Sequence, residues 1–185
     1  MQNSVPFLEV CQRVEIYYLD FFYTLNLRFG GFIFLEIVME FSEIKNSKNH
    51  YADLLLLADE QTDMIEKYLH RGRIFVLKDP DVRAECVVTD EGRGVLEIKN
   101  IAVYPQYQRL GYGKRLIEFI EKTFADDFDI LQVGTGDSPL TVPFYENCGF
   151  KKSYAVKNFF TDNYDHPIFE AGIQLVDMIY FNKKL

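Results

Sequence analysis

Hydrophobic and polar residues alternate along the chain with two periods, one typical of helices and one typical of strands. Between Tyr51 and Leu69, apolar residues recur at helical spacing, and the acidic stretch from Asp59 to Asp63 interrupts them. This pattern predicts two consecutive helices joined near residues 58–61. The same analysis predicts helices at 114–124 and 141–147 and strands at 40–44, 73–77, 84–88, 95–104, 130–133, 151–156 and 174–181. The resulting order is a mixed α/β pattern.

The turn between strand 95–104 and helix 114–124 has the most informative sequence in the chain. It reads Gln108-Arg109-Leu110-Gly111-Tyr112-Gly113 and follows Pro105, which ends the strand. A glycine-containing turn at this place directs successive backbone N–H groups and the positive end of the helix dipole toward one point, a geometry that binds phosphate. Taken alone, the turn fits an ordinary strand–turn–helix corner about as well.

This turn resembles the acetyl-CoA signature Q/R-x-x-G-x-G/A of the GCN5-related N-acetyltransferases, the GNAT superfamily. Gln108, Gly111 and Gly113 occupy its three fixed positions. A second stretch, Phe144-Tyr145-Glu146-Asn147-Cys148-Gly149-Phe150, resembles the family's short helix that ends in a G-F pair. The resemblance covers residues 39–185. It implies a twisted mixed sheet of about six or seven strands, flanked by about four helices and splayed between its fourth and fifth strands.

The resemblance also implies that acetyl-CoA is the co-substrate and that backbone groups hold most of it. Residues 101–103 are expected to pair with the pantetheine arm like an added strand, and the amides of residues 109–114 are expected to surround the pyrophosphate. Asp137 follows the fifth strand, where relatives often carry an Asn that contacts CoA, and departs from that pattern. The candidate cofactor-binding residues are Ile101, Ala102, Val103, Gln108, Arg109, Leu110, Gly111, Tyr112, Gly113, Lys114 and Asp137.

Acetyl transfer to an amine requires that the amine lose a proton and that the leaving thiolate gain one. Tyr145 is the candidate acid, because the pKa of a phenol is about 10, close to that of a thiol, and the family places a tyrosine of this helix beside the sulfur. Glu97 is the candidate base, at a spacing from Gly111 that resembles the histone-acetylating branch of the family. The alternatives are that Tyr145 is a core aromatic beside Phe144 and that Glu97 only pairs with Lys99.

The C-terminal run from Phe159 to Met178 resembles small uncharacterised acetyltransferases of Gram-positive bacteria. In the superfamily, loops between the last two strands help to form the acceptor pocket. The candidate substrate-binding residues are therefore Tyr164, Asp165, His166 and Glu170. The alternative is a packed aromatic lid that makes no contact with substrate.

Composition narrows the class of protein. A length of 185 residues suits one domain, and 48% hydrophobic with 16% aromatic residues indicates a globular protein. The net charge of −8 argues against nucleic acid as the main partner and is compatible with an amine-bearing substrate. The three cysteines and three histidines are scattered, so we expect neither a disulfide framework nor a metal site.

The first 38 residues precede the family resemblance. The stretch from Val14 to Met39 is rich in Phe, Tyr, Leu and Ile, but charged residues interrupt it and it lacks the features of a signal peptide. We therefore expect no membrane span and place a boundary before Met39. Two alternatives stay open for residues 1–38: an extension that packs on the domain, or the product of an upstream start codon.

These observations predict a cytoplasmic N-acetyltransferase, monomer or homodimer, that uses acetyl-CoA and no metal. The expected reaction moves an acetyl group to a primary amine of a small molecule or peptide by direct attack in a ternary complex, with neither nucleic acid nor membrane as a partner. The alternative is a non-catalytic acyl-CoA-binding or regulatory module that keeps the cofactor cleft.

Overall fold

The computed structural model describes residues 15–19, 22–29 and 32–185, with side chains described from Met39 onward. The described strands are β1 (Glu15–Leu19), β2 (Phe22–Phe29), β3 (Phe32–Ile44), β4 (Arg73–Lys78), β5 (Val82–Gly92), β6 (Val95–Val103), β7 (Ile130–Gly136), β8 (Lys151–Val156), β9 (Phe169–Glu170), β10 (Ile173–Gln174) and β11 (Met178–Lys184). The described helices are α1 (Ala52–Ala58), α2 (Thr62–Leu69), α3 (Tyr112–Phe124), α4 (Thr141–Asn147) and α5 (Phe159–Asn163), with 3-10 turns η1 (Lys48–Tyr51) and η2 (Pro105–Tyr107).

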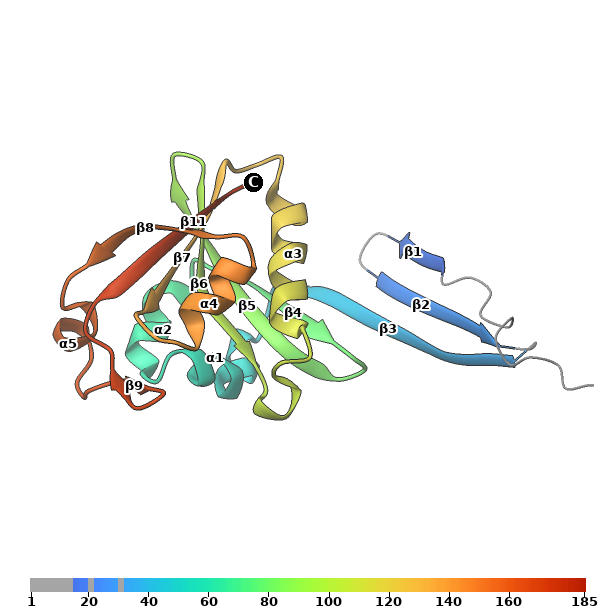
Figure 1. The fold of residues 1–185 in the computed structure, drawn as a ribbon, viewed down its shortest axis with the longest axis horizontal. Helices are drawn as coiled ribbons and strands as arrows, with labels where there is room; N and C mark the ends of the chain where they lie inside the picture. The colour runs from blue at the N-terminus through green and yellow to red at the C-terminus, as the bar shows by residue number, and fades with distance from the viewer. Residues whose placement is uncertain (1–14, 20–21, 30–31) are drawn as a thin grey trace, which may run out of the picture.

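Among the described residues, nine strands form one mixed sheet, from which β1, β2 and the start of β3 extend away from the helices (Figure 1). Its order is β1-β2-β3-β4-β5-β6-β7-β11-β8, and the small β9–β10 hairpin stands apart from it. Helix α3 packs on one face, where Leu116 and Ile120 join a large core cluster with side chains of β4, β5 and β6. Helices α1 and α2 cover the other face through Leu55 and Ile65. Two apolar helix stripes therefore bury both faces of the central strands.

The sheet separates between β6 and β7. These two strands are parallel, and their pairing covers only Val95–Ile98 of β6 and Ile130–Val133 of β7. Strand β7 continues beyond Val133 and is paired there with the antiparallel strand β11 alone. The backbone of β6 after Ile98 is therefore left without a strand partner on that side, and a wedge-shaped space opens between the two strands. The mixed sheet, splayed at this place, confirms the predicted fold class.

Most predicted elements are confirmed. The two early helices, the helix after the glycine turn, helix α4 and strand β8 occur where the pattern predicts them. The last strand was predicted wrongly: it begins at Met178, and Gln174 belongs to β10. The short helix α5 was not predicted. Both differences have one cause: residues 176 and 177 bond to the start of α5 and are not part of a strand. Phe160 N–H donates to Val176 C=O at 3.0 Å, and Asn158 N–H donates to the Asp177 carboxylate at 3.0 Å.

The strand β3 crosses the predicted boundary at Met39. Its pairing with β4 involves only Glu40 to Ile44, while its N-terminal part pairs with β2. The first strand expected by family resemblance is thus present, as the C-terminal end of a longer strand. That residues 39–185 form an independent domain stays a prediction. No helix within the described residues is long and apolar enough to cross a membrane.

Candidate active site

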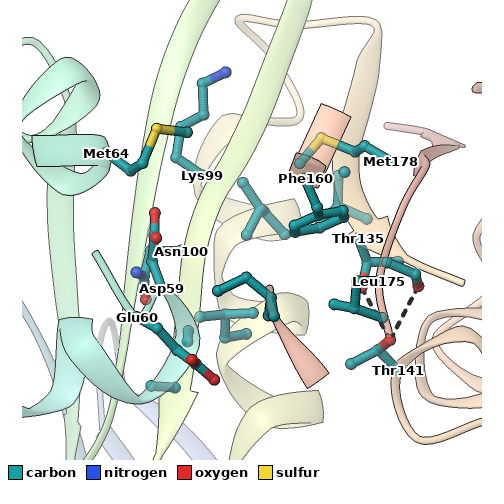
Figure 2. A pocket seen from close by; sticks show the side chains of 18 of the residues that line it. Asp59, Glu60, Met64, Lys99, Asn100, Thr135, Thr141, Phe160, Leu175 and Met178 are labelled. Atoms are coloured by element: carbon teal, nitrogen blue, oxygen red, sulfur yellow. Dashed lines mark hydrogen bonds between the residues drawn. The ribbon is translucent and has the colours of Figure 1, made fainter. Parts of the chain in front are cut away.

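A cavity of about 540 Å³ fills the space where β6 and β7 separate. Figure 2 shows its two sides: Asp59 and Glu60, from the corner between α1 and α2, lie opposite Thr135 and Thr141 of β7 and α4. The remaining walls come from β6, α5 and the segment from β9 to β11. Segments distant in sequence therefore meet where the β6 backbone has no strand partner on its β7 side.

The glycine turn leads into α3 with a backbone suited to anion binding. Arg109 and Gly111 both adopt left-handed conformations, with φ of 62° and 88°. The first internal bond of the helix joins Arg115 N–H to Gly111 C=O at 3.0 Å, so the amides just before Arg115 have no carbonyl one turn earlier. A Cβ built on Gly111 would meet no atom within 4 Å. The turn therefore presents free N–H groups and an unobstructed backbone, as a phosphate site requires.

Other residues of this turn pack against neighbouring elements. A Cβ on Gly113 would lie 3.3 Å from the Phe144 ring and 3.6 Å from a Val103 methyl group, so this glycine allows α3 to approach α4 and β6 closely. The Tyr112 side chain points away from the turn, where its hydroxyl donates to Asp79 at 2.6 Å. The Gln108 side chain turns back and donates to Val103 C=O at 3.2 Å. Of these residues, Gln108 and Val103 line the cavity.

The expected pantetheine strand lies on the cavity wall. Ile101, Ala102 and Val103 all line the cavity and belong to the part of β6 that pairs with β5 but has no strand partner on the β7 side. A β-bulge precedes them: Val88 pairs with Ile98 and Val87 pairs with Asn100, which leaves Lys99 as the extra residue. A bulge bends the strand and increases its twist. It therefore turns β6 away from β7 at the start of the cavity.

Tyr145 is 6% exposed, and its side chain reaches the cavity from the α3 face of the sheet. Its ring packs against Phe144, Phe150 and Phe181 with centroid separations of 5.1, 5.8 and 6.4 Å. In the described part of the chain the hydroxyl has no hydrogen-bond partner. Burial raises the pKa of this hydroxyl well above its ordinary value, with smaller contributions from nearby thiols and from Glu170. A buried, protonated and unpaired donor thus faces the cavity.

Glu97 lies on the opposite face of the sheet from Tyr145, because its neighbour Ile98 points into the α3 core. It lines the cavity and is 6% exposed. One carboxylate oxygen accepts from Lys99 Nζ at 2.7 Å, and the other accepts from Gln132 Nε2 at 3.0 Å. The ion pair that the sequence offered as an alternative is therefore present.

Tyr164 and Glu170, two of the four candidate acceptor residues, line the cavity. The Tyr164 hydroxyl donates to Asp59 at 3.0 Å, and the Asp165 amide donates to Gln61 Oε1 at 3.1 Å. These contacts join the α1–α2 corner to the segment after α5. The side chains of Asp165 and His166 are exposed and lie outside the cavity, where the pKa of His166 is raised, first by its hydrogen bond with Asp165.

Several other candidates also lie outside the cavity. Asp137 is exposed, and so are Arg109, Leu110 and Lys114 of the turn. The family resemblance assigns pyrophosphate binding to the backbone amides of the turn, so the side chains of these turn residues need not line the cavity. The neighbour of Asp137, Ser138, is buried and its hydroxyl accepts from Leu140 N–H at 3.1 Å, so it shapes the entry into α4.

Sequence reasoning missed a polar group beneath the α1–α2 corner. Asn100 Nδ2 donates to Leu55 C=O at 3.0 Å and to the Tyr68 hydroxyl at 2.8 Å, and Tyr68 donates to Asp59 at 3.4 Å. Desolvation raises the pKa of Asp59. In the sequence Asp59 was only part of an acidic interruption between two helices, because its partner Tyr164 is more than a hundred positions away.

A second buried carboxyl lies next to this group. Glu85, on β5, is fully buried, and neither of its side-chain oxygens has a hydrogen-bond partner within the described residues. Burial raises its pKa to about 8. It pairs across the sheet with Ala102 of the cavity wall. No group of three or more His, Cys, Asp or Glu side chains in the described part of the chain is arranged to hold a metal ion.

The comparisons with known proteins agree with this fold. Residues 70–152 match the family described as acetyltransferase (GNAT) domain. Over 130 residues the chain is 39% identical to the uncharacterized N-acetyltransferase YvbK of Bacillus subtilis, a match that covers 69% of this chain and 84% of the relative. The chain therefore belongs to the GNAT acetyltransferase family, which confirms the predicted resemblance.

Solved structures support the same conclusion. A GNAT family acetyltransferase from Elizabethkingia anophelis with acetyl-CoA bound has a TM-score of 0.75 and 32% identity, over 80% of this chain and 98% of that one. An acetyltransferase of Bacillus subtilis in complex with CoA has a TM-score of 0.72 and 33% identity, over 80% of this chain and 99% of that one.

Proposed function

We propose that the protein transfers the acetyl group of acetyl-CoA to a primary amine by direct attack in a ternary complex. The observation that carries the proposal is the Tyr145 hydroxyl, which is buried, protonated, unpaired in the described chain, and turned toward the cavity beside the open edge of β6. The cofactor-bound states of two similar structures support acetyl-CoA as the donor.

In the proposed complex the thioester lies between β6 and α4. Backbone groups of residues 101–103 bind the pantetheine arm, and the amides of residues 109–114 bind the pyrophosphate. The amine nitrogen attacks the thioester carbonyl carbon, a C–N bond forms and the C–S bond breaks. Tyr145 donates its proton to the departing thiolate.

The attacking amine gives up its proton on the other side of the sheet. Glu97 is the proposed acceptor, either directly or through water. Its pairing with Lys99 and Gln132 fixes the carboxylate within the cavity wall but leaves it less free to accept a proton. A water chain that bypasses Glu97 is the alternative route for this proton.

The direct test measures CoA release from acetyl-CoA by a thiol reagent in the presence of a panel of primary amines, with calorimetric titration of acetyl-CoA alongside. We expect tight binding of acetyl-CoA and amine-dependent thiol release. Tight binding without turnover for any amine would favour the non-catalytic acyl-CoA-binding module. Absence of binding would refute both functions.

A further inference from the structure

The cavity carries carboxylates on two opposite sides, and both lack a cationic partner. Asp59 accepts hydrogen bonds from the hydroxyls of Tyr164 and Tyr68 and from the backbone N–H of Gln61, all of them neutral donors. Glu170 accepts only from the Thr141 hydroxyl, at 3.4 Å. Within residues 39–185 no Lys, Arg or His lies within ion-pair distance of either carboxylate. Burial without a counter-ion is costly for a carboxylate, and a bound cation would relieve that cost.

Three cationic side chains line the cavity: Arg71 and Lys99 pair with acids, and the third, Lys67, contacts Met64 Sδ at 2.8 Å. Lys99 pairs with Glu97 at 2.7 Å and with Glu91 at 3.4 Å, and Arg71 pairs with Glu91 at 2.6 Å. Lys67 is exposed. None of these three cations therefore pairs with Asp59 or Glu170.

Apolar surface lies along the same cavity. Phe160, Ile168 and Leu175 form a buried cluster, with Met178 packed against it, and all four line the cavity. In Figure 2, Phe160, Leu175 and Met178 lie on the side facing Asp59 and Glu60. Carboxylates on two sides of a cavity that also has apolar walls match an aliphatic chain that has an amine at each end.

We propose that the acceptor is an aliphatic diamine or polyamine. One amine lies near Glu170 and the Tyr145 hydroxyl and receives the acetyl group. The second stays protonated and binds Asp59; Glu60, at the same corner, pairs with His166 at 3.7 Å. This inference rests on the proposed acetyl transfer and adds to it the class of acceptor.

The experiment compares matched acceptors of equal chain length. The α,ω-diamines from 1,3-diaminopropane to 1,8-diaminooctane are each assayed beside the n-alkylamine and the amino alcohol with the same number of carbons. For at least one length, kcat/KM of the diamine should exceed that of both partners by about tenfold or more, as expected for a charge-assisted hydrogen bond. Equal kcat/KM at every length would overturn the proposal while leaving acetyl transfer intact.

The variant Asp59→Asn assigns the preference to its residue. Asparagine keeps an oxygen that accepts from Tyr164, but it removes the charge. The ratio of kcat/KM for diamine to amino alcohol should fall from about tenfold to near one. Glu66→Gln is the control, since Glu66 is an exposed acid of α2 that does not line the cavity, and it should leave the ratio unchanged. An equal loss for both acceptors in Asp59→Asn would make Asp59 a structural residue and overturn its role.

Binding tests the inference separately from catalysis. Calorimetric titration of the best diamine into the protein saturated with CoA should show at least about tenfold weaker binding in Asp59→Asn than in the wild type. If acetyl-CoA binds but no amine is turned over, the proposed acetyl transfer is refuted. Diamine binding that still depends on Asp59 would in that case support the diamine site by itself. Equal binding by both proteins, or none to either, would refute the site.

Discussion

Replacing Tyr145 with Phe separates its chemical role from its packing role. The substitution removes a hydroxyl that has no hydrogen-bond partner in the described chain and keeps a ring that packs on Phe144, Phe150 and Phe181. We therefore expect the free energy of unfolding to change by less than about 0.5 kcal/mol. Loss of a general acid lowers kcat by roughly 10²–10⁴, equivalent to about 3–5 kcal/mol of transition-state stabilisation.

The assay combines thiol release at saturating acetyl-CoA and acceptor with denaturant unfolding and calorimetric binding of CoA. Tyr51→Phe is a matched control, because Tyr51 is partly buried against the α1–α2 core and does not line the cavity. Burial raises the pKa of Tyr145 above its usual value of about 10, so the hydroxyl stays protonated across ordinary assay pH. The pH–rate profiles of the wild type and of Tyr145→Phe should thus run parallel below about pH 9. Wild-type kcat in Tyr145→Phe would show that solvent protonates the thiolate and that Tyr145 is a core residue.

Four further predictions follow from the structure. Gly111→Val should weaken CoA binding at least about tenfold by calorimetry. Gly92→Val, at the end of β5, has a similar left-handed φ and open space and should not weaken it; equal affinity in both would refute the phosphate role of the turn. A fragment of residues 39–185 should fold and bind CoA, because all pairing of β3 with β4 lies within Glu40–Ile44; a molten fragment by near-UV circular dichroism would show that residues 1–38 are part of the core. Glu97→Gln should lower kcat most at low pH, where the acceptor is most protonated; an unchanged acidic limb would reduce Glu97 to its ion pair. Burial raises the pKa of Glu85 to about 8 in the folded protein, against about 4.3 when unfolded, so its contribution to stability is complete below about pH 4 and is lost as pH rises toward about 8. In Glu85→Gln the fall in unfolding free energy between pH 5 and pH 8 should therefore be smaller than in the wild type by on the order of 3 kcal/mol. An identical pH dependence of both proteins in denaturant titrations would contradict the assignment.

The sequence by itself determined the local elements and the cofactor turn. Helix α2 lies where the hydrophobic period predicts, because its buried residues Met64, Ile65 and Leu69 recur at the spacing of one helix face. The sequence also identified Gly111, because the left-handed backbone at this position, with φ of 88°, favours glycine and this preference is local. The extra helix α5 escaped because its start is held by Asp177, nineteen positions away.

Tertiary structure alone decided which polar groups meet. The contact between Asp59 and Tyr164, 105 positions apart, exists only because α1–α2 and the segment after α5 close over the same gap in the sheet. Likewise, the bulge at Lys99 depends on the partner strand β5, and it determines that Asn100 turns toward Tyr68. A periodic pattern records burial but carries no information on the partner across a cavity. Hydrogen bonds between distant side chains depend on the packing of the whole chain, and here they define the acceptor end of the site.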